Sequence, residues 1–506
     1  MVRASDCIRS SAIGRLITHL PGAVVRLSDA IVRMSGGSTI VRLCSWLCAT
    51  LKRVAHGSAV LGWTDRVWTD HIWTDHAATR KVLQRAPQRI PQIKSVAQWL
   101  AAMVPALVLL TGDQERAAVV LIALIATAWA AGRLTKADTA LEGKAFGKAY
   151  GRWLALLLLG SAFSVVFGSG DIQLAVWYEW IFWWMAAWLA YQSGGFITRT
   201  HRFGTVLAGL GIGFGILAVL QKTAGYGDVA GWVPLAVRPI VGARATGFFG
   251  NPNVFAAAVN LVMWPLAGFV AHQATKRDAK QVVRTVIYAI ALAGLMLALV
   301  LTRSRAAWLG ALGAAAIMIP QTPFFHKNKT RPGFWVATGA LVLLIITILI
   351  PIPHGAERSS LELIQNPNAA WQGRLTIWKE AIQLFLHSPL SGGGPGSLSN
   401  IALPGGAQAF HAHNMLLQWL AETGLLLTLI TILFIGWYYA QTRAHARARS
   451  YPRSLLLSGF SAAITATLIH GIFDYPWAAR PIGLLWWAWI GFGLSLVAAD
   501  KETWQQ

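Results

Sequence analysis

The chain has 506 residues, of which 55% are hydrophobic and only 12% are charged. A soluble domain carries about 25% charged residues, so this composition excludes a secreted or cytosolic enzyme and indicates a polytopic membrane protein. The 43 Lys and Arg outnumber the 20 Asp and Glu, an excess that in a membrane protein points to anionic lipid and topology rather than nucleic acid. Three cysteines, Cys7, Cys44 and Cys48, are too few and too badly spaced for a disulfide framework or a zinc site.

Residues 1–95 are predicted to form a basic cytoplasmic extension. They contain 14 Lys and Arg and no apolar core long enough for a signal peptide. A Trp-Thr-Asp triplet recurs at Trp63, Trp68 and Trp73, and its five-residue period gathers the tryptophans on one side of neither a helix nor a strand. Two interpretations stay open: a segment lying on the inner leaflet, or disorder, including a start codon assigned too far upstream.

From residue 96 onward, uncharged apolar runs predict an all-α, polytopic membrane domain over residues 96–498 with about twelve transmembrane helices. A cytoplasmic tail, 499–506, follows it. The expected spans lie near 96–112, 117–132, 153–168, 174–192, 204–220, 254–270, 285–301, 306–320, 335–351, 415–440, 455–469 and 481–498.

Basic residues concentrate on alternate connections between these spans. Two to five Lys or Arg occur in each of 133–152, 193–203, 271–284, 321–333 and 441–453. The positive-inside rule places these connections and both termini in the cytoplasm. The remaining connections then face outward, and two of them, 221–253 and 352–413, are long. Loops beyond about 15 residues are usually functional or disordered, so we expect the chemistry in these outer loops.

The first long outer loop ends with two arginines, Arg238 and Arg244, and then with Asn251-Pro252-Asn253. Asn251 followed by Pro252 is typical of a helix N-cap with proline in the first turn. Each arginine close to the membrane either anchors to lipid phosphate or binds an anionic ligand.

The short outer turn Thr302-Arg303-Ser304-Arg305 carries two arginines in four residues. It breaks the charge rule that the rest of the chain obeys, which indicates an anionic partner. A guanidinium group stays charged and donates two parallel hydrogen bonds to phosphate oxygens. Several arginines on one outer face therefore predict a phosphate or pyrophosphate site.

The second long outer loop, 352–413, predicts an amphipathic helix at the membrane interface between Gly373 and Phe385, with Arg374 at its start. The following cluster Ser391-Gly392-Gly393-Gly394-Pro395-Gly396 lacks the Lys-Ser/Thr ending of a phosphate-binding loop. We interpret it as a turn.

The same loop closes with His411, His413 and Asn414, and the last outer loop contains Asp474. Histidine is the side chain best suited to move protons near neutral pH. His413 is thus either a general base or a structural residue at a helix N-terminus. The outer loops offer few further histidines and no cysteine, so we expect no metal. Asp474 could orient His413, bind a sugar hydroxyl or pair with an arginine, and the sequence does not choose.

In their order along the chain, these segments resemble the O-antigen ligase and polymerase superfamily of bacterial membrane glycosyltransferases. That family has an arginine and an Asn-Pro-Asn-like segment before one span, Ser-Arg opening another, and Gly-Arg-x-x-x-Trp with a glycine-rich turn. A His-Asn pair then leads into Leu-Gln and Glu-x-Gly. The matching segments here are Arg244 to Asn253, Thr302 to Gly310, Gly373 to Gly396 and His413 to Gly424. The turn Asp474-Tyr475-Pro476 is similar to that of polymerase and protein-glycosylating members, whereas residues 1–95 depart from the family.

The resemblance implies a GT-C-like fold in the bacterial inner membrane, with the active site facing the periplasm. It implies a glycan donor linked to undecaprenyl pyrophosphate, an inverting transfer without cofactor or metal, and contact with membrane lipid. His413 would be the catalytic base, while Arg244 and Arg305 would stabilise the leaving pyrophosphate. Further substrate-binding candidates are Arg238, Arg303, Arg374, His411, Asn414 and Asp474.

The acceptor stays open between a lipid A core sugar (a ligase), a growing glycan (a polymerase) and a protein Ser or Thr (an O-oligosaccharyltransferase). The alternative of another class is a multi-span transporter, since some relatives are labelled bicarbonate carriers. The sequence disfavours a transporter, because it has neither a two-half repeat nor paired interrupted helices, and because its charged groups lie in outer loops.

Overall fold

The computed structural model describes the greater part of residues 143–501, within one compact unit of the chain. The described ranges are 143–197, 201–223, 244–274, 279–319, 369–402, 408–409, 411–448 and 451–501. The expected extension 1–95, the spans expected near 96–112, 117–132 and 335–351, and the candidate Arg238 lie outside the described residues.

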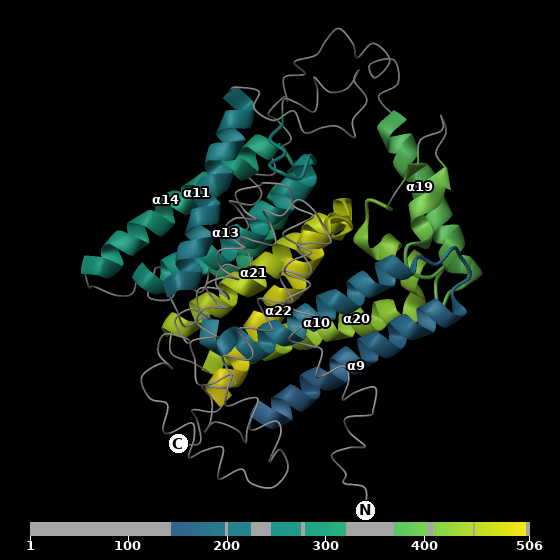
Figure 1. Cartoon of the computed structure of the whole chain (residues 1–506), viewed down its shortest axis with the longest axis horizontal. Coiled ribbons are helices and arrows are strands. Elements are labelled where there is room, and N and C mark those ends of the chain that lie inside the picture. Colours follow the sequence, from purple (N-terminus) through teal and green to yellow (C-terminus); the bar gives the residue numbers. More distant parts are fainter. Residues whose placement is uncertain are drawn as a thin grey trace, which may run out of the picture. The chain divides into compact units, whose positions relative to one another are not determined.

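The described secondary structure is helical, apart from one pair of two-residue strands (Figure 1). The helices are α9 (Gly143–Phe167), α10 (Leu174–Ile197), α11 (His201–Thr223), α13 (Pro252–Ala274), α14 (Ala279–Thr302), α15 (Arg305–Met318), α19 (Ala369–His387), α20 (Met415–Ala448), α21 (Tyr451–Phe473) and α22 (Arg480–Lys501). Two short 3₁₀ turns are η3 (Ser397–Asn400) and η4 (Pro476–Ala478). Strands β1 (Ile401–Ala402) and β2 (Gln408–Ala409) pair antiparallel, with Ile401 opposite Ala409.

Seven of the described helices are long and apolar enough to cross a membrane: α9, α11, α13, α14, α20, α21 and α22. The expectation of a polytopic, helical membrane protein is therefore confirmed, while the number of twelve spans stays a prediction. Helix α10 coincides with the span expected at 174–192 but is not among the seven. Helix α15 has 14 residues, about 21 Å at 1.5 Å per residue, which is short of the roughly 30 Å hydrocarbon core.

The core of the bundle is formed by α13, α21 and α22, which lie side by side (Figure 1). Between 72 and 94% of the most apolar window of each of these helices is buried. Small residues allow the close packing: a Cβ on Gly491 of α22 would lie 2.1 Å from the carbonyl oxygen of Ala187 on α10. By contrast, α9 and α14 expose leucine and valine side chains such as Leu159 and Val283, as expected of surfaces that face lipid.

The glycine-rich turn predicted at 391–396 packs against an interruption of α20. Gly424 has a φ of 64° within that helix, so backbone groups next to it need partners outside the helix. Gly393 N–H donates to the carbonyl of Ala421 at 2.7 Å, and Leu425 N–H donates to that of Pro389 at 2.8 Å. The turn therefore satisfies the backbone at the break in α20.

The connections on which we expected outward-facing chemistry meet at one end of the bundle. The α9–α10 connection joins the glycine-rich turn, since Gly170 N–H donates to the Gly393 carbonyl at 2.9 Å. The segment before α13 joins the α14–α15 turn, since Ala245 N–H donates to the Leu301 carbonyl at 2.9 Å. This shared end also carries the candidate site, although which side of a membrane it faces stays a prediction.

Candidate active site

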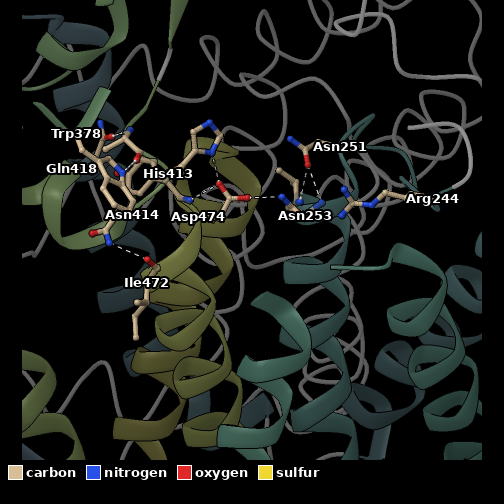
Figure 2. Close-up of polar contacts among 12 residues, drawn as sticks. Arg244, Asn251, Asn253, Trp378, His413, Asn414, Gln418, Ile472 and Asp474 are labelled. Atoms are coloured by element: carbon tan, nitrogen blue, oxygen red, sulfur yellow. Dashed lines mark hydrogen bonds and ion pairs between the residues drawn. The ribbon is translucent and has the colours of Figure 1, made fainter. Parts of the chain in front are cut away.

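The centre of the candidate site is a hydrogen bond between His413, just before α20, and Asp474, just after α21 (Figure 2). His413 Nδ1 lies 2.9 Å from Asp474 Oδ1. The imidazole is 36% exposed while the carboxylate is only 9% exposed. A substrate can therefore reach the histidine, whereas the aspartate is covered by the protein.

Asp474 is held as a carboxylate. Burial by itself would raise its pKa, but the hydrogen bond with His413 and the nearby His470 outweigh burial and hold the Asp474 pKa well below its usual range. The backbone N–H of Tyr475 also donates to Asp474 Oδ1 at 2.8 Å. Because an ionised carboxylate only accepts hydrogen bonds, His413 Nδ1–H is the donor in this pair, so in the neutral ring the lone pair is on Nε2. That is the tautomer required of a general base.

The second oxygen of Asp474 connects this pair to an arginine. Asn253 Nδ2 donates to Asp474 Oδ2 at 2.7 Å, and Arg244 donates through a terminal nitrogen to Asn253 Oδ1 at 2.9 Å. Arg244 Nε also donates to the carbonyl of Thr302 at 2.8 Å. Figure 2 shows this continuous path from His413 through Asp474 and Asn253 to Arg244.

The start of α13 aims Asn253 at Asp474. Asn251 is the predicted N-cap, and its Oδ1 accepts from the backbone N–H of Asn253 at 2.9 Å and of Val254 at 3.4 Å. Pro252 occupies the first helical position, where a missing N–H costs nothing. This cap fixes the first turn, so the Asn253 side chain is held at the helix end that faces α21.

The segment preceding that cap is held by Gln221 from the end of α11. Its Oε1 accepts from the backbone N–H of Thr246 at 3.0 Å and of Gly247 at 2.9 Å, and its Nε2 donates to the Gly247 carbonyl at 2.9 Å. Gly247 has a φ of 58°, and a Cβ there would lie 2.5 Å from the ring of Phe255. Glycine is thus required where the chain turns toward Arg244.

Arginines gather at the start of α15. Arg305 is its first residue and is exposed, whereas Arg303 is half-buried with a φ of 51°. Burial lowers the pKa of Arg244 to about 10, and the nearby charges of Arg303 and Arg305 act in the same direction. The guanidinium group is the most persistently charged side-chain group in proteins. Three cations this close together favour an anionic ligand.

The N-cap of α15 adds a polar group to this cluster. Ser304 is 2% exposed, its side chain makes no cap hydrogen bond, and its Oγ has no partner within the described part of the chain. The N-terminal N–H groups of a helix also favour negative charge. The segment from Thr302 to Arg305, the arginine turn, thus combines guanidinium groups, a helix N-terminus and a hydroxyl without a partner in the described part of the chain.

His411 lies beside the catalytic candidate, with ring centroids 4.2 Å apart between His411 and His413. Burial lowers the pKa of His411 to about 4, and the neighbouring His413 adds to the effect, so His411 is neutral near pH 7. Arg374 of α19 acts on it in the same direction. One ligand atom each from His411, His413 and Asp474 lie within 4.8 Å of one another, an arrangement that a metal ion could also use.

Asn414 caps α20 and ties it to α21. Its Oδ1 accepts from the backbone N–H of Leu417 at 3.0 Å, and its Nδ2 donates to the carbonyl of Ile472 at 2.9 Å. The adjacent His413 is one of two described non-glycine residues with a positive φ, at 48°. Its backbone is therefore in a sparsely populated region that surrounding contacts must maintain.

Of the residues predicted from the sequence, the structure brings His413, His411, Asp474 and Arg244 into one connected group, with Arg303 and Arg305 beside Arg244 and with Arg374 near His411. Their roles stay predictions. Sequence reasoning assigned no role to Asn253 or Gln221. Asn253 belongs to the Asn-Pro-Asn segment and could have been suspected, whereas nothing in the sequence around Gln221 distinguishes it.

Comparison with known proteins gives one family match. Residues 289–432 match the sequence model of a family described as O-antigen ligase. The match includes the arginine turn, α19 and His413, and it confirms the resemblance to the O-antigen ligase and polymerase superfamily. Arg244, Asn253 and Asp474 lie outside the matched segment. No curated protein gives a significant match to the chain.

Proposed function

We propose that this protein transfers a glycan from undecaprenyl pyrophosphate to an acceptor hydroxyl, as a surface-polysaccharide ligase or polymerase of the O-antigen type. The observation that carries the proposal is the connected path from His413 through Asp474 and Asn253 to Arg244, beside the arginine turn. It sets a proton acceptor next to a cationic anion-binding cluster. Glycosyl transfer from a pyrophosphate carrier needs both.

His413 acts as the general base. Its Nε2 takes the proton of the acceptor hydroxyl while that oxygen attacks the anomeric carbon of the donor. Asp474 accepts from Nδ1–H, which keeps the ring in the required tautomer and stabilises the imidazolium that forms. The new bond joins the acceptor oxygen to the anomeric carbon, and attack opposite the leaving group inverts the configuration there.

The arginines stabilise the leaving group. As the bond between the anomeric carbon and the phosphate oxygen breaks, its electron pair stays on the undecaprenyl pyrophosphate. Arg244 and Arg305 neutralise the growing charge, assisted by Arg303 and the N-terminus of α15. Arg374, close to His411, assists from α19, and Arg238 is a further candidate from the sequence. Fixed cations supply in this way the electrostatic stabilisation that a metal supplies in other glycosyltransferases.

A small apolar cavity next to the site, about 40 Å³ in volume, offers a contact for part of the isoprenoid chain. It adjoins the site, because Tyr475 follows Asp474 directly, and it lies between α10, α20, η4 and α22. Aromatic side chains form most of its lining, which consists of Trp180, Trp183, Trp184, Trp419, Thr423, Leu427, Thr431, Tyr475, Trp477 and Trp487. An isoprenoid chain that contacts these aromatic side chains would leave its pyrophosphate at the end of the bundle where the polar residues meet.

The positive-inside rule supports placing this end in the periplasm of the bacterial inner membrane, where the flipped lipid-linked glycan is available. The acceptor is a lipid A core sugar or a growing glycan. A protein hydroxyl remains the alternative within the same chemistry, because the similarity of Asp474-Tyr475-Pro476 to protein-glycosylating members favours it.

Transfer with the purified protein tests the proposal. The protein in lipid nanodiscs is mixed with undecaprenyl-pyrophosphate glycan and either lipid A core, a second lipid-linked glycan or a pilin-like protein, with a chelator present. We expect a glycosylated product and equimolar undecaprenyl pyrophosphate. In cells, deleting the gene should abolish the surface glycan, as seen by gel electrophoresis of a cell extract. Unchanged surface glycan together with no transfer to any acceptor would favour the transporter class instead.

A further inference from the structure

A buried carboxyl group lies in α20, two turns beyond the candidate site. Glu422 is 4% exposed, in a segment that is otherwise apolar enough to cross a membrane. Burying an ionisable side chain in such a segment is costly unless it is hydrogen-bonded. The mechanism proposed above gives Glu422 no role, so its contacts must account for its presence.

Those contacts lead back to the site. The Glu422 carboxyl group interacts with the side chain of Gln418 and with the backbone of Gly396 and Leu398. Gln418 Oε1 in turn accepts from the backbone N–H of Ala412 at 2.7 Å. Gln418 lies one helical turn before Glu422, so the two side chains share one face of α20, and Gln418 reaches back to Ala412 in the segment before the helix. Together they form a relay from Glu422 to Ala412.

The relay ends on the peptide between the two histidines. Ala412 is fully buried, and its carbonyl accepts from the indole N–H of Trp378 on α19 at 2.9 Å. Its backbone is therefore held on one side by α19 and on the other by Gln418. Figure 2 shows Trp378 and Gln418 beside this segment, on the side of His413 away from Asn253.

The next residue is His413, whose φ of 48° places it in the left-handed region. A non-glycine residue in that region costs of order 1–3 kcal/mol and persists only when its surroundings determine it. In an extended or right-handed conformation the imidazole would leave Asp474, because Cβ would point in another direction. The hydrogen bonds that hold the Ala412 peptide oppose this change.

We infer that Glu422 is a positioning residue for His413, acting through Gln418 and the Ala412 peptide. This inference rests on the proposed function for its kinetic consequence but not for its structural one. Glu422 orients Gln418 so that its amide oxygen faces Ala412 and its amide nitrogen faces α20. Misplacing a reacting group by about 1 Å can cost on the order of 10²-fold in rate. We therefore expect substitution of Glu422 to lower kcat.

Exchanging the two side chains tests the relay. Gln418→Glu alone brings two carboxyl groups together, and Glu422→Gln alone turns an amide N–H₂ group toward backbone donors. The double exchange restores the pattern: Glu at 418 accepts from Ala412 N–H and from the new amide at 422, whose oxygen faces Gly396. Thr428→Val is the matched control, since Thr428 is buried in the same helix and hydrogen-bonds only to Thr423 among the interactions described.

Two readouts are compared for folded protein in nanodiscs. In the transfer assay we expect each single variant to lower kcat on the order of 10–100-fold with little change in donor KM, the double exchange to recover most of the loss, and the control to match wild type. Glu422→Gln should have no further effect in a His413→Ala background, because it acts only through that ring. The second readout is the rate at which diethyl pyrocarbonate modifies His413, measured by peptide mass spectrometry. This rate should differ from wild type in the single variants and return to the wild-type value in the double exchange.

The two hypotheses fail separately. If the wild-type protein transfers no glycan but the single variants change the modification rate of His413 as expected, the proposed function is contradicted and the positioning role is supported. Active wild type with single variants that match it in kcat and in modification rate would overturn the positioning role. A loss in both single variants that the exchange does not recover would also overturn it, since Glu422 would then serve only the packing of the glycine-rich turn.

Discussion

At the residue scale, the candidate chemistry depends on the different hydrogen-bond partners of the two carboxylate oxygens of Asp474. Oδ1 meets His413 Nδ1 and Oδ2 meets Asn253 Nδ2, at 2.9 and 2.7 Å. One carboxylate thereby orients the proposed base and, through an amide, an arginine. The base and the anion-binding group are thus held in one rigid arrangement, so that proton removal and leaving-group stabilisation can occur in the same step.

Replacing Asp474 with Asn tests this division. An Asn amide has one acceptor oxygen and so cannot serve both neighbours. If the oxygen accepts from His413 Nδ1–H, the amide nitrogen meets Asn253 Nδ2 and two donors face each other; if the amide turns round to satisfy Asn253, it donates to His413 Nδ1 and favours the wrong tautomer. We expect kcat to fall by about 10²-fold or more with folded protein retained, because the imidazole loses both its fixed tautomer and its counter-charge. Steady-state transfer kinetics measure the effect. Wild-type kcat in Asp474→Asn would show that the hydrogen bond has no role in catalysis.

Replacing Arg305 distinguishes charge from geometry. Lys keeps the positive charge but lacks the planar pair of donors that fits phosphate oxygens. We expect Arg305→Lys to lower kcat clearly and Arg305→Ala to lower it further, on the order of 10²–10³-fold as for loss of one oxyanion donor. Lys280, exposed at the start of α14, provides a control as Lys280→Ala. Equal activity of all three variants would exclude Arg305 from leaving-group stabilisation.

The sequence alone indicated most of these residues but not their connections. Titratable and cationic residues are unusual in outer loops beside apolar spans. Their presence there identified His413, Asp474 and the arginines as candidates. The partner of Asp474 stayed open among three possibilities, since a sequence contains no distances between loops. Asn253 and Gln221 act through single side-chain hydrogen bonds, and asparagine and glutamine are too common in loops to signal such a role.

At the element scale, the interruption of α20 positions the site. A continuous apolar run predicted one span over 415–440, and the helix does extend from Met415 to Ala448. Its Gly424, however, leaves the helical conformation, and the glycine-rich turn fills the gap by pairing with the exposed backbone. Hydropathy cannot reveal such a break, because glycine is common in membrane helices without interrupting them.

Two glycines of α20 make a matched test of this junction. At Gly424, with a φ of 64°, a Cβ would lie 2.4 Å from the Leu390 carbonyl group; at Gly436 a Cβ meets nothing within 4 Å. Gly424→Ala should destabilise the fold by at least about 1–3 kcal/mol, because a φ of 64° with a ψ of −173° is a backbone conformation that essentially only glycine adopts, and the steric clash adds to this cost. Gly436→Ala should be neutral or stabilising by up to about 1 kcal/mol.

Thermal unfolding in detergent, with the fraction of monodisperse protein, measures both variants. A melting temperature for Gly424→Ala equal to that of Gly436→Ala would contradict the junction. The same comparison explains why the run Ser391 to Gly396 is glycine-rich: Gly392, Gly394 and Gly396 all have positive φ, and an added Cβ would meet neighbouring atoms within 3 Å. The glycines serve backbone packing in this turn.

At the scale of the whole molecule, the helices bring separate loops to one end. The charge pattern of the sequence assigned the connections without basic clusters, and the segments before α13 and α20, to one side of the membrane. In the structure, several of these segments are joined by backbone hydrogen bonds. The charge pattern could predict this grouping, because successive spans must alternate in direction. It could not predict that α13, α21 and α22 form the core, since helix order in a bundle depends on side-chain fit rather than on hydropathy.

Thiol labelling tests which side this end faces. In a variant without Cys7, Cys44 and Cys48, single cysteines are placed at Phe248, exposed before α13, and at Lys280, exposed at the opposite end of the bundle. The positive-inside rule predicts that an impermeant maleimide labels position 248 in intact spheroplasts and labels position 280 only after lysis. The reverse pattern would place the candidate site in the cytoplasm and contradict the proposed periplasmic transfer.

The measurement that tests the central claim most directly is transfer by His413→Ala beside His411→Ala, with purified undecaprenyl-pyrophosphate glycan, with and without chelator. If His413 is the base and no metal takes part, His413→Ala should lose about 10²–10⁴-fold in kcat and still bind the lipid-linked donor, because the arginines and the aromatic cavity remain. His411→Ala should retain substantial activity, and the chelator should have no effect. Near-normal turnover by His413→Ala would contradict the account, and inhibition by the chelator together with inactive His411→Ala would make the two histidines and Asp474 metal ligands instead.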